Sequence, residues 1–161
     1  MRVDFTRVIE VCLIVDTCVA HLILTRTDDL EFKPVHDAIF GMRRRTTLVY
    51  GGKLAREYEG NKAVRRVVLT LDRSGRARKE SDEKVDAETK RLERQKLCRS
   101  NDQHIIALAR VGAVRLLCTH DKNSGLMADF KRKSLLDNPR GSVYTRNTQR
   151  HLIAQHCDCT A

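Results

Sequence analysis

Two apolar segments of the chain each run into an aspartate. The segment VCLIVD, residues 11–16, ends at Asp16, and VRLLCTHD, residues 114–121, ends at Asp121. Each apolar run is typical of a parallel strand that is covered on both faces. Ligands of open α/β sheets bind outside the carboxyl ends of the strands, so both aspartates are expected at the functional edge. Taken singly, Asp16 could instead cap the following helix, and Asp121 could be an ordinary turn residue.

Two further acids are expected on the inward faces of helices. A helical pattern runs from Lys53 to about Leu71, and Glu57 falls near the middle of its apolar arc. Asp102 shares the core-facing stripe of the next predicted helix, since it precedes Ile105, Ile106 and Ala109 by three, four and seven residues. A first-turn acid also complements the helix dipole, whichever way it faces. A buried carboxylate is costly unless it is paired, neutralised or bound to a metal.

These four carboxylates predict a cation site if they meet at one sheet edge. Their mutual repulsion would raise some of their pKa values unless a cation were present. Mg²⁺ is held in proteins by a few carboxylates together with waters and phosphate oxygens. Such a cation acidifies a water and neutralises charge on phosphoryl oxygens, and a second cation about 4 Å away would stabilise the leaving oxygen. The chemistry indicated is hydrolysis of a phosphodiester.

Strands and helices alternate along the chain. Strands are predicted at 11–15, 46–50, 113–119 and 141–145. Helices are predicted at 17–26, after Pro34, and at 53–71, 83–99, 100–112, 122–133 and 147–156. Ser100, with Gln103 three residues later, forms a capping-box pattern at the start of its helix. This alternation predicts a three-layer α/β/α sandwich with a mainly parallel central sheet.

The charge of the chain favours a polyanionic partner. The 161 residues include 31 basic and 21 acidic side chains, for a formal net charge of +10. Aromatic residues make up only 4% and tryptophan is absent, so phosphate contacts are expected to dominate over base stacking. Basic residues flank the second predicted strand and could hold an RNA backbone, although a solvated basic loop explains them equally well: Arg43, Arg44, Arg45, Lys53 and Arg56.

The chain is expected to form a single domain, residues 1–161, with a charged helical insertion at about 73–99. Residues 73–82 have no apolar period and predict a solvated link. The helix that follows has a thin apolar stripe through Val85, Leu92 and Cys98. Its charged surface is typical of a solvated face, and an arm that contacts RNA or a partner chain is the alternative.

Composition also favours the cytoplasm and no membrane. No apolar run approaches the roughly 18 to 20 residues that span a bilayer, and acids interrupt the region where a signal peptide would be apolar. The six cysteines contain no CxxC pair, so free thiols are expected, as in a reducing compartment. The segment HLIAQHCDC offers zinc donors, but a frayed tail fits its spacing better: His151, His156, Cys157 and Cys159.

The sequence resembles the PIN-domain ribonucleases, including the toxin members of that family. VCLIVDTCVA resembles the opening strand and first acid of the family, and LVYGGKLAREY resembles its second strand and helix. SNDQHIIALARVGAVRLLCTHD resembles the segment that joins the third acid to a T-x-D ending. The resemblance implies an Mg²⁺- or Mn²⁺-dependent endonuclease that cuts RNA, with the metal held by four acids: Asp16, Glu57, Asp102 and Asp121.

The resemblance further implies supporting residues and partners. Thr17 and Thr119 would support the site through their hydroxyls, and His120 near the site could contact a phosphate. His120 stands where the family often has Asn, and Asn123 where it is often acidic, which leaves the number of metals open. Expected partners are RNA, with DNA as an alternative, a cognate antitoxin or regulatory protein, and a second copy of the chain. The competing hypothesis is a catalytically inactive PIN-like module that binds RNA or protein.

Overall fold

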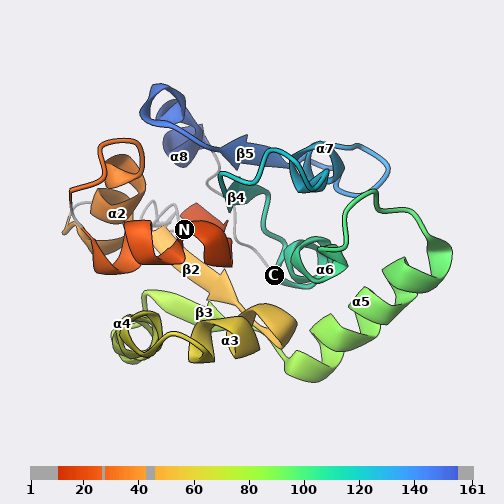
Figure 1. The fold of residues 1–161 in the computed structure, drawn as a ribbon, viewed down its shortest axis with the longest axis horizontal. Coiled ribbons are helices and arrows are strands. Elements are labelled where there is room, and N and C mark those ends of the chain that lie inside the picture. Colours follow the sequence, from red (N-terminus) through yellow and green to blue (C-terminus); the bar gives the residue numbers. More distant parts are fainter. Residues whose placement is uncertain (1–10, 27, 43–45, 156–161) are drawn as a thin grey trace, which may run out of the picture.

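A five-stranded parallel sheet forms the centre of the protein. The computed structural model describes residues 11–26, 28–42 and 46–155. The strands are β1 (Val11–Val15), β2 (Thr46–Tyr50), β3 (Ala77–Lys79), β4 (Leu116–Cys118) and β5 (Ser142–Tyr144), in the spatial order β3-β2-β1-β4-β5. All neighbouring pairs are parallel. Helices cover both faces, so the predicted three-layer α/β/α fold is confirmed (Figure 1).

The helices follow the strands in alternation. They are α1 (Thr17–Ala20), η1 (His21–Thr25), α2 (Lys33–Phe40), α3 (Gly52–Glu59), α4 (Lys62–Arg73), α5 (Asp82–Gln95), α6 (Gln103–Gly112), α7 (Leu126–Phe130), η2 (Asn147–Gln149) and α8 (His151–Gln155). The helix predicted at 17–26 is a single α-turn that continues as the π-helix η1. The last predicted helix is likewise divided into the 3₁₀ turn η2 and α8.

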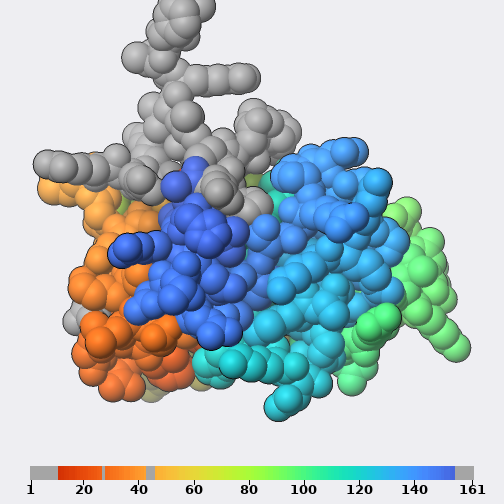
Figure 2. Space-filling view, turned by 90° about the horizontal axis from the view of Figure 1, so that it is seen from above, coloured from red at the N-terminus to blue at the C-terminus, as the bar shows by residue number. Residues whose placement is uncertain are grey.

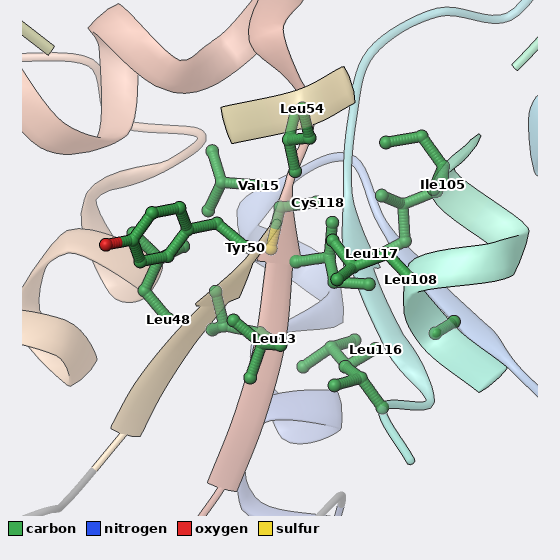
Figure 3. Close-up of a cluster of buried hydrophobic side chains, with 14 of the residues drawn as sticks. Leu13, Val15, Leu48, Tyr50, Leu54, Ile105, Leu108, Leu116, Leu117 and Cys118 are labelled. Carbon is green, nitrogen blue, oxygen red and sulfur yellow. The ribbon is translucent and has the colours of Figure 1, made fainter. Parts of the chain in front are cut away.

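The core rigidly supports the carboxyl end of β1. Every residue of β1 is buried, and Leu13 pairs with Leu48 of β2 while Ile14 pairs with Leu117 of β4. Leu54 of α3, together with two side chains of α6, closes over these strands (Figure 3). Complete burial of one such side chain stabilises the fold by about 1.5–3 kcal/mol. The residue that follows β1 is therefore fixed in place by the best-packed part of the molecule.

The helix predicted from Lys53 to Leu71 is broken in two. The Asn61 side chain accepts hydrogen bonds from the amides of Ala63 (3.1 Å) and Val64 (3.2 Å), which caps the start of α4. The continuous helix predicted from the apolar period is thus wrong, because the cap at Asn61 restarts the helix in a new direction. Glu57 belongs to the short helix α3 alone.

Two glycines let α3 start close to its neighbours. Gly52 has φ +58°, and a Cβ atom there would lie 2.6 Å from Val85 Cγ1. Gly51 has φ +152°, and its Cβ would lie 2.8 Å from the carbonyl oxygen of Glu80. The Gly52 amide donates to Asp82 Oδ1 at 2.8 Å. The turn at these glycines therefore also holds α3 against the start of α5.

The charged stretch 73–99 is built into the fold. The solvated link predicted at 73–82 contains β3, in which Arg78 pairs with Val49 of β2, so that prediction is wrong for these three residues. A short, charged edge strand has no apolar period to reveal it. Helix α5 packs against α6 with Val85 and Leu92 fully buried, while its outer face is exposed along one edge of the molecule (Figure 2).

The oxidation state of the cysteines and the length of the helices can be compared with the predicted cytoplasmic location. Cys18, Cys98 and Cys118 are free thiols, whereas Cys12 is disulfide-bonded, so the expectation of free thiols is wrong for Cys12. Cys157 and Cys159 lie outside the described residues. Within the part of the chain that the structure describes, no helix combines the length and apolar character needed to cross a membrane.

Candidate functional site

Asp16 is held at the end of β1 by Thr119. Its backbone amide donates to the carbonyl of Cys118 (2.9 Å), and its carboxylate accepts a hydrogen bond from the Thr119 hydroxyl (2.8 Å). The Cys18 thiol lies 3.4 Å from the same oxygen, Oδ2. Asp16 occupies the position before α1 but its side chain makes no capping bond, so helix capping does not explain the residue.

Thr119 joins Asp16 to Asp121. The Thr119 side chain is fully buried, and its Oγ1 accepts a hydrogen bond from the amide of Asp121 (3.1 Å) while donating to Asp16. Asp121 Oδ1 accepts from the amides of Asn123 and Ser124, each at 3.2 Å. These bonds, with one from the Ser124 hydroxyl first among the causes, lower the pKa of Asp121. The turn role proposed for Asp121 is therefore correct, and it leaves Asp121 next to Asp16.

Glu57 connects three helices. Its Oε2 accepts a hydrogen bond from the Thr17 hydroxyl of α1 (2.6 Å) and lies 3.7 Å from His104 Nε2 of α6. Its Oε1 lies 3.9 Å from the ammonium nitrogen of Lys53 on α3 itself. The next residue, Tyr58, is buried and donates its hydroxyl to the carbonyl of Val15. This bond ties α3 to the last residue of β1, directly before Asp16.

Asp102 is the N-cap residue of α6, although its side chain makes no capping bond. The helix was predicted to begin at Ser100, which is wrong by two residues, because the Ser100 hydroxyl instead accepts from the amide of Asp102 (3.3 Å). Burial raises the pKa of Asp102, and the negative charges of Asp16, Asp121 and Glu57 raise it further. His104 acts in the opposite direction. Asp16, Glu57 and Asp121 are thus each close enough to Asp102 to raise its pKa.

The raised pKa of Asp102 gives a pH-dependent prediction. In the unfolded chain its carboxyl titrates near the usual value of about 3.9, so folding favours the protonated form. Below that value both states are protonated and there is no penalty. The penalty grows as the pH rises from the unfolded-state pKa to the raised pKa of the folded state, and it is constant above that pKa. Asp102→Asn should therefore stabilise the metal-free protein at pH 7, by less than about 1 kcal/mol because the site is partly solvated.

Thermal unfolding of the wild-type protein and of Asp102→Asn between pH 7 and pH 3.5 checks this prediction. The increase in Tm should shrink as the pH falls and vanish below about pH 4. Asparagine is as good an N-cap residue as aspartate, so the helix start is preserved. An increase that is independent of pH would contradict the electrostatic explanation.

His104 is a site residue that the sequence did not single out. Its side chain is only 3% exposed, and among the described residues its Nε2 has no hydrogen-bond partner. Burial lowers the pKa of His104 despite the opposing attraction of Glu57 and Asp102. Its ring is thus uncharged at neutral pH. The spacing of His104 with Leu108 and Val111 on α6 could have indicated an inward-facing histidine.

His120 and the basic residues predicted to bind RNA differ in the contacts they make. His120 is exposed directly after Thr119, and its charge contributes to lowering the pKa of Asp121. Arg56 is exposed but forms a two-pronged ion pair with Asp86 of α5, at 3.0 and 3.3 Å. Lys53 lies beside Glu57, whereas three predicted RNA-binding residues fall outside the described residues: Arg43, Arg44 and Arg45.

The donors do not form a complete metal site in their present arrangement. Within residues 11–26, 28–42 and 46–155, no group of three or more His, Cys, Asp and Glu side chains could hold a metal ion. The chemical types nevertheless fit a divalent cation, since the Glu57 carboxylate oxygen Oε2 lies 3.7 Å from the unpartnered Nε2 of His104. Of the possible zinc donors in HLIAQHCDC, a segment whose spacing favours a frayed tail, His156, Cys157 and Cys159 lie outside the described residues.

The two free thiols near the site, Cys18 and Cys118, are poorly suited to act as nucleophiles. Burial raises the pKa of Cys18, and burial likewise raises the pKa of Cys118. Both thiols are therefore protonated at neutral pH, which argues against a nucleophilic cysteine here.

In comparisons with known proteins, no family model, curated protein or solved structure matches the chain.

Proposed function

We propose that the chain is a PIN-like, metal-dependent endoribonuclease that hydrolyses RNA phosphodiester bonds with Mg²⁺ or Mn²⁺. The observation that carries the proposal is the hydrogen-bonded link from the Asp16 carboxylate through the buried Thr119 hydroxyl to Asp121, with Glu57 held by the hydroxyl of Thr17, the residue after Asp16. Carboxylates held in this way at the carboxyl end of a parallel sheet are the arrangement expected around a hard cation and a phosphate.

The chain's own residues would hold and orient the reacting groups. Asp16 is the most firmly placed ligand, since β1 fixes its backbone and Thr119 fixes its carboxylate. Glu57, which Thr17 holds at one oxygen, would bind the cation or orient a water. When bound, the cation would acidify a water and neutralise charge on the phosphoryl oxygens. Without the cation, the carboxylates would repel a phosphate group, because like charges repel.

The proposed substrate follows from the charge of the chain. A net charge of +10 attracts a polyanion, and the Lys53 ammonium, 3.9 Å from Glu57 Oε1, adds positive charge beside the site. Arg56 would have to leave Asp86 to contact RNA. We further propose that the protein acts in the cytoplasm, on RNA in preference to DNA, and that an antitoxin-like protein or a second copy of the chain restrains or completes it.

Cleavage assays test the proposal. Purified full-length chain should cut labelled RNA when Mg²⁺ or Mn²⁺ is added, and EDTA should stop the reaction. Asp121→Asn should reduce cleavage strongly, because the amide keeps an oxygen for the turn bonds to Asn123 and Ser124 but loses the charge. Cleavage that continues unchanged in EDTA, or that survives this substitution, would exclude the proposed chemistry.

The inactive PIN-like binding module remains the second candidate, because a specific observation favours it. No group of three donors among the described residues could hold a metal as arranged. In addition, Glu57 already has partners in Thr17 and Lys53. Titration calorimetry separates the two candidates: the nuclease should bind Mn²⁺, and binding of RNA without measurable binding of Mn²⁺ would favour the module.

A further inference from the structure

The imidazole of His104 points an unsatisfied nitrogen toward the Glu57 carboxylate. His104 is 3% exposed, and its Nε2 lies 3.7 Å from Glu57 Oε2 without a hydrogen-bond partner among the described residues. A separation of 3.7 Å is too long for a hydrogen bond. Buried polar atoms normally have partners, so this one calls for a group that is absent from the protein itself.

The distance between His104 and Glu57 would allow both side chains to bind one cation. Nitrogen and oxygen ligands lie about 2.0–2.2 Å from a bound divalent metal, so two ligands of one ion can stand up to roughly 4.2 Å apart. The 3.7 Å between His104 Nε2 and Glu57 Oε2 falls within that limit. A neutral imidazole that carries its proton on Nδ1 would direct the lone pair of Nε2 toward this position. Asp102, two residues before His104, adds negative charge from the same helix start.

We propose that His104 supplies a nitrogen ligand to the cation of the carboxylate site, and that the site therefore prefers a first-row transition ion to Mg²⁺. This inference rests on the proposed function, because it concerns the same site. Mg²⁺ takes oxygen ligands almost exclusively, whereas imidazole is a good ligand for first-row transition metals. Of the four acids and His104, only the histidine distinguishes the two classes of ion.

Pulsed electron paramagnetic resonance of full-length protein loaded with Mn²⁺ tests the proposal directly. The wild-type protein should show a ¹⁴N coupling to the Mn²⁺ ion, and His104→Leu should remove it. His120→Gln should retain the coupling, which separates the buried histidine from the exposed one beside Asp121. His104→Gln serves as a second variant if the leucine variant fails to fold, and it should also lack the coupling.

Calorimetric titrations with Mn²⁺ and Mg²⁺ supply the second measurement. His104→Leu should weaken Mn²⁺ binding about tenfold or more relative to Mg²⁺, while Asp16→Asn should weaken the binding of both ions. Mn²⁺ binding by the wild-type protein without a ¹⁴N coupling, or with a coupling that survives both His104 variants, would overturn the role of His104 and leave the nuclease proposal standing. A wild-type protein that binds neither ion would overturn both proposals.

Discussion

Asp16→Asn is expected to lower the rate of metal-dependent RNA cleavage by about 100-fold or more. A bound cation contributes several kcal/mol to stabilising the transition state, and each 1.36 kcal/mol corresponds to about a factor of ten in rate. The amide retains one oxygen that can accept the hydrogen bond of Thr119, so the loss should arise from the missing charge and not from a displaced side chain. Single-turnover cleavage with saturating Mn²⁺ measures this effect.

A matched substitution on the surface controls for the removal of negative charge. Asp28 is exposed and pairs with the exposed Arg26, so Asp28→Asn should cleave RNA at the wild-type rate. Circular dichroism and thermal unfolding should show that Asp16→Asn remains folded. Equal rates for Asp16→Asn and Asp28→Asn would mean that Asp16 takes no part in the reaction.

The strands that carry the site could be predicted because the pattern that identifies each of them lies within five consecutive residues. Residues 11–15 and 46–50 are continuous apolar or β-branched segments, and both form strands with the predicted bounds. Such a segment needs burial on two faces, which few structures other than a central parallel strand provide. The position of Asp16 at the sheet edge followed from that constraint together with the chain direction.

The helical acids were identified from patterns that were partly incorrect. Glu57 was placed on the inward face of a helix that in fact ends at Glu59, yet its side chain still points toward Thr17. The reason is that the buried residues of α3 itself, including Leu54 and Tyr58, fix its rotation, so the residues after Asn61 were not needed. Asp102 precedes its helix instead of lying on the stripe, because Ser100 bonds to its amide.

The partners of two residues that organise the site could not be identified from spacing. His104 had no recognisable partner in sequence, since its neighbour Glu57 is 47 positions away and belongs to another helix. Asp129 lies in a short helix, α7, and the backbone amides that donate hydrogen bonds to it come from the loop before α6. Such contacts depend on how the elements pack, and a single sequence contains no direct record of that packing.

Asp129→Asn is expected to destabilise the protein by about 3 kcal/mol. The fully buried carboxylate accepts hydrogen bonds from the amides of Arg99 and Ser100 at 2.9–3.0 Å and pairs with Arg132 at 2.8 Å. Breaking a buried ion pair by removing one partner costs about 3–5 kcal/mol, and we take the lower end because Arg132 is one-third exposed. Urea denaturation measures the loss in the free energy of unfolding.

The same substitution should loosen the approach to the candidate site. Arg132 also donates to the carbonyl of Leu97 (2.6 Å), so Asp129 and Arg132 together clamp the loop that leads to Asp102. Amide hydrogen exchange at Arg99 and Ser100 should therefore accelerate more than exchange in β1. The surface variant Asp37→Asn, which breaks an exposed ion pair with Lys33, should cost no more than about 1 kcal/mol. A comparably small loss for Asp129→Asn would show that the buried carboxylate does not hold this loop.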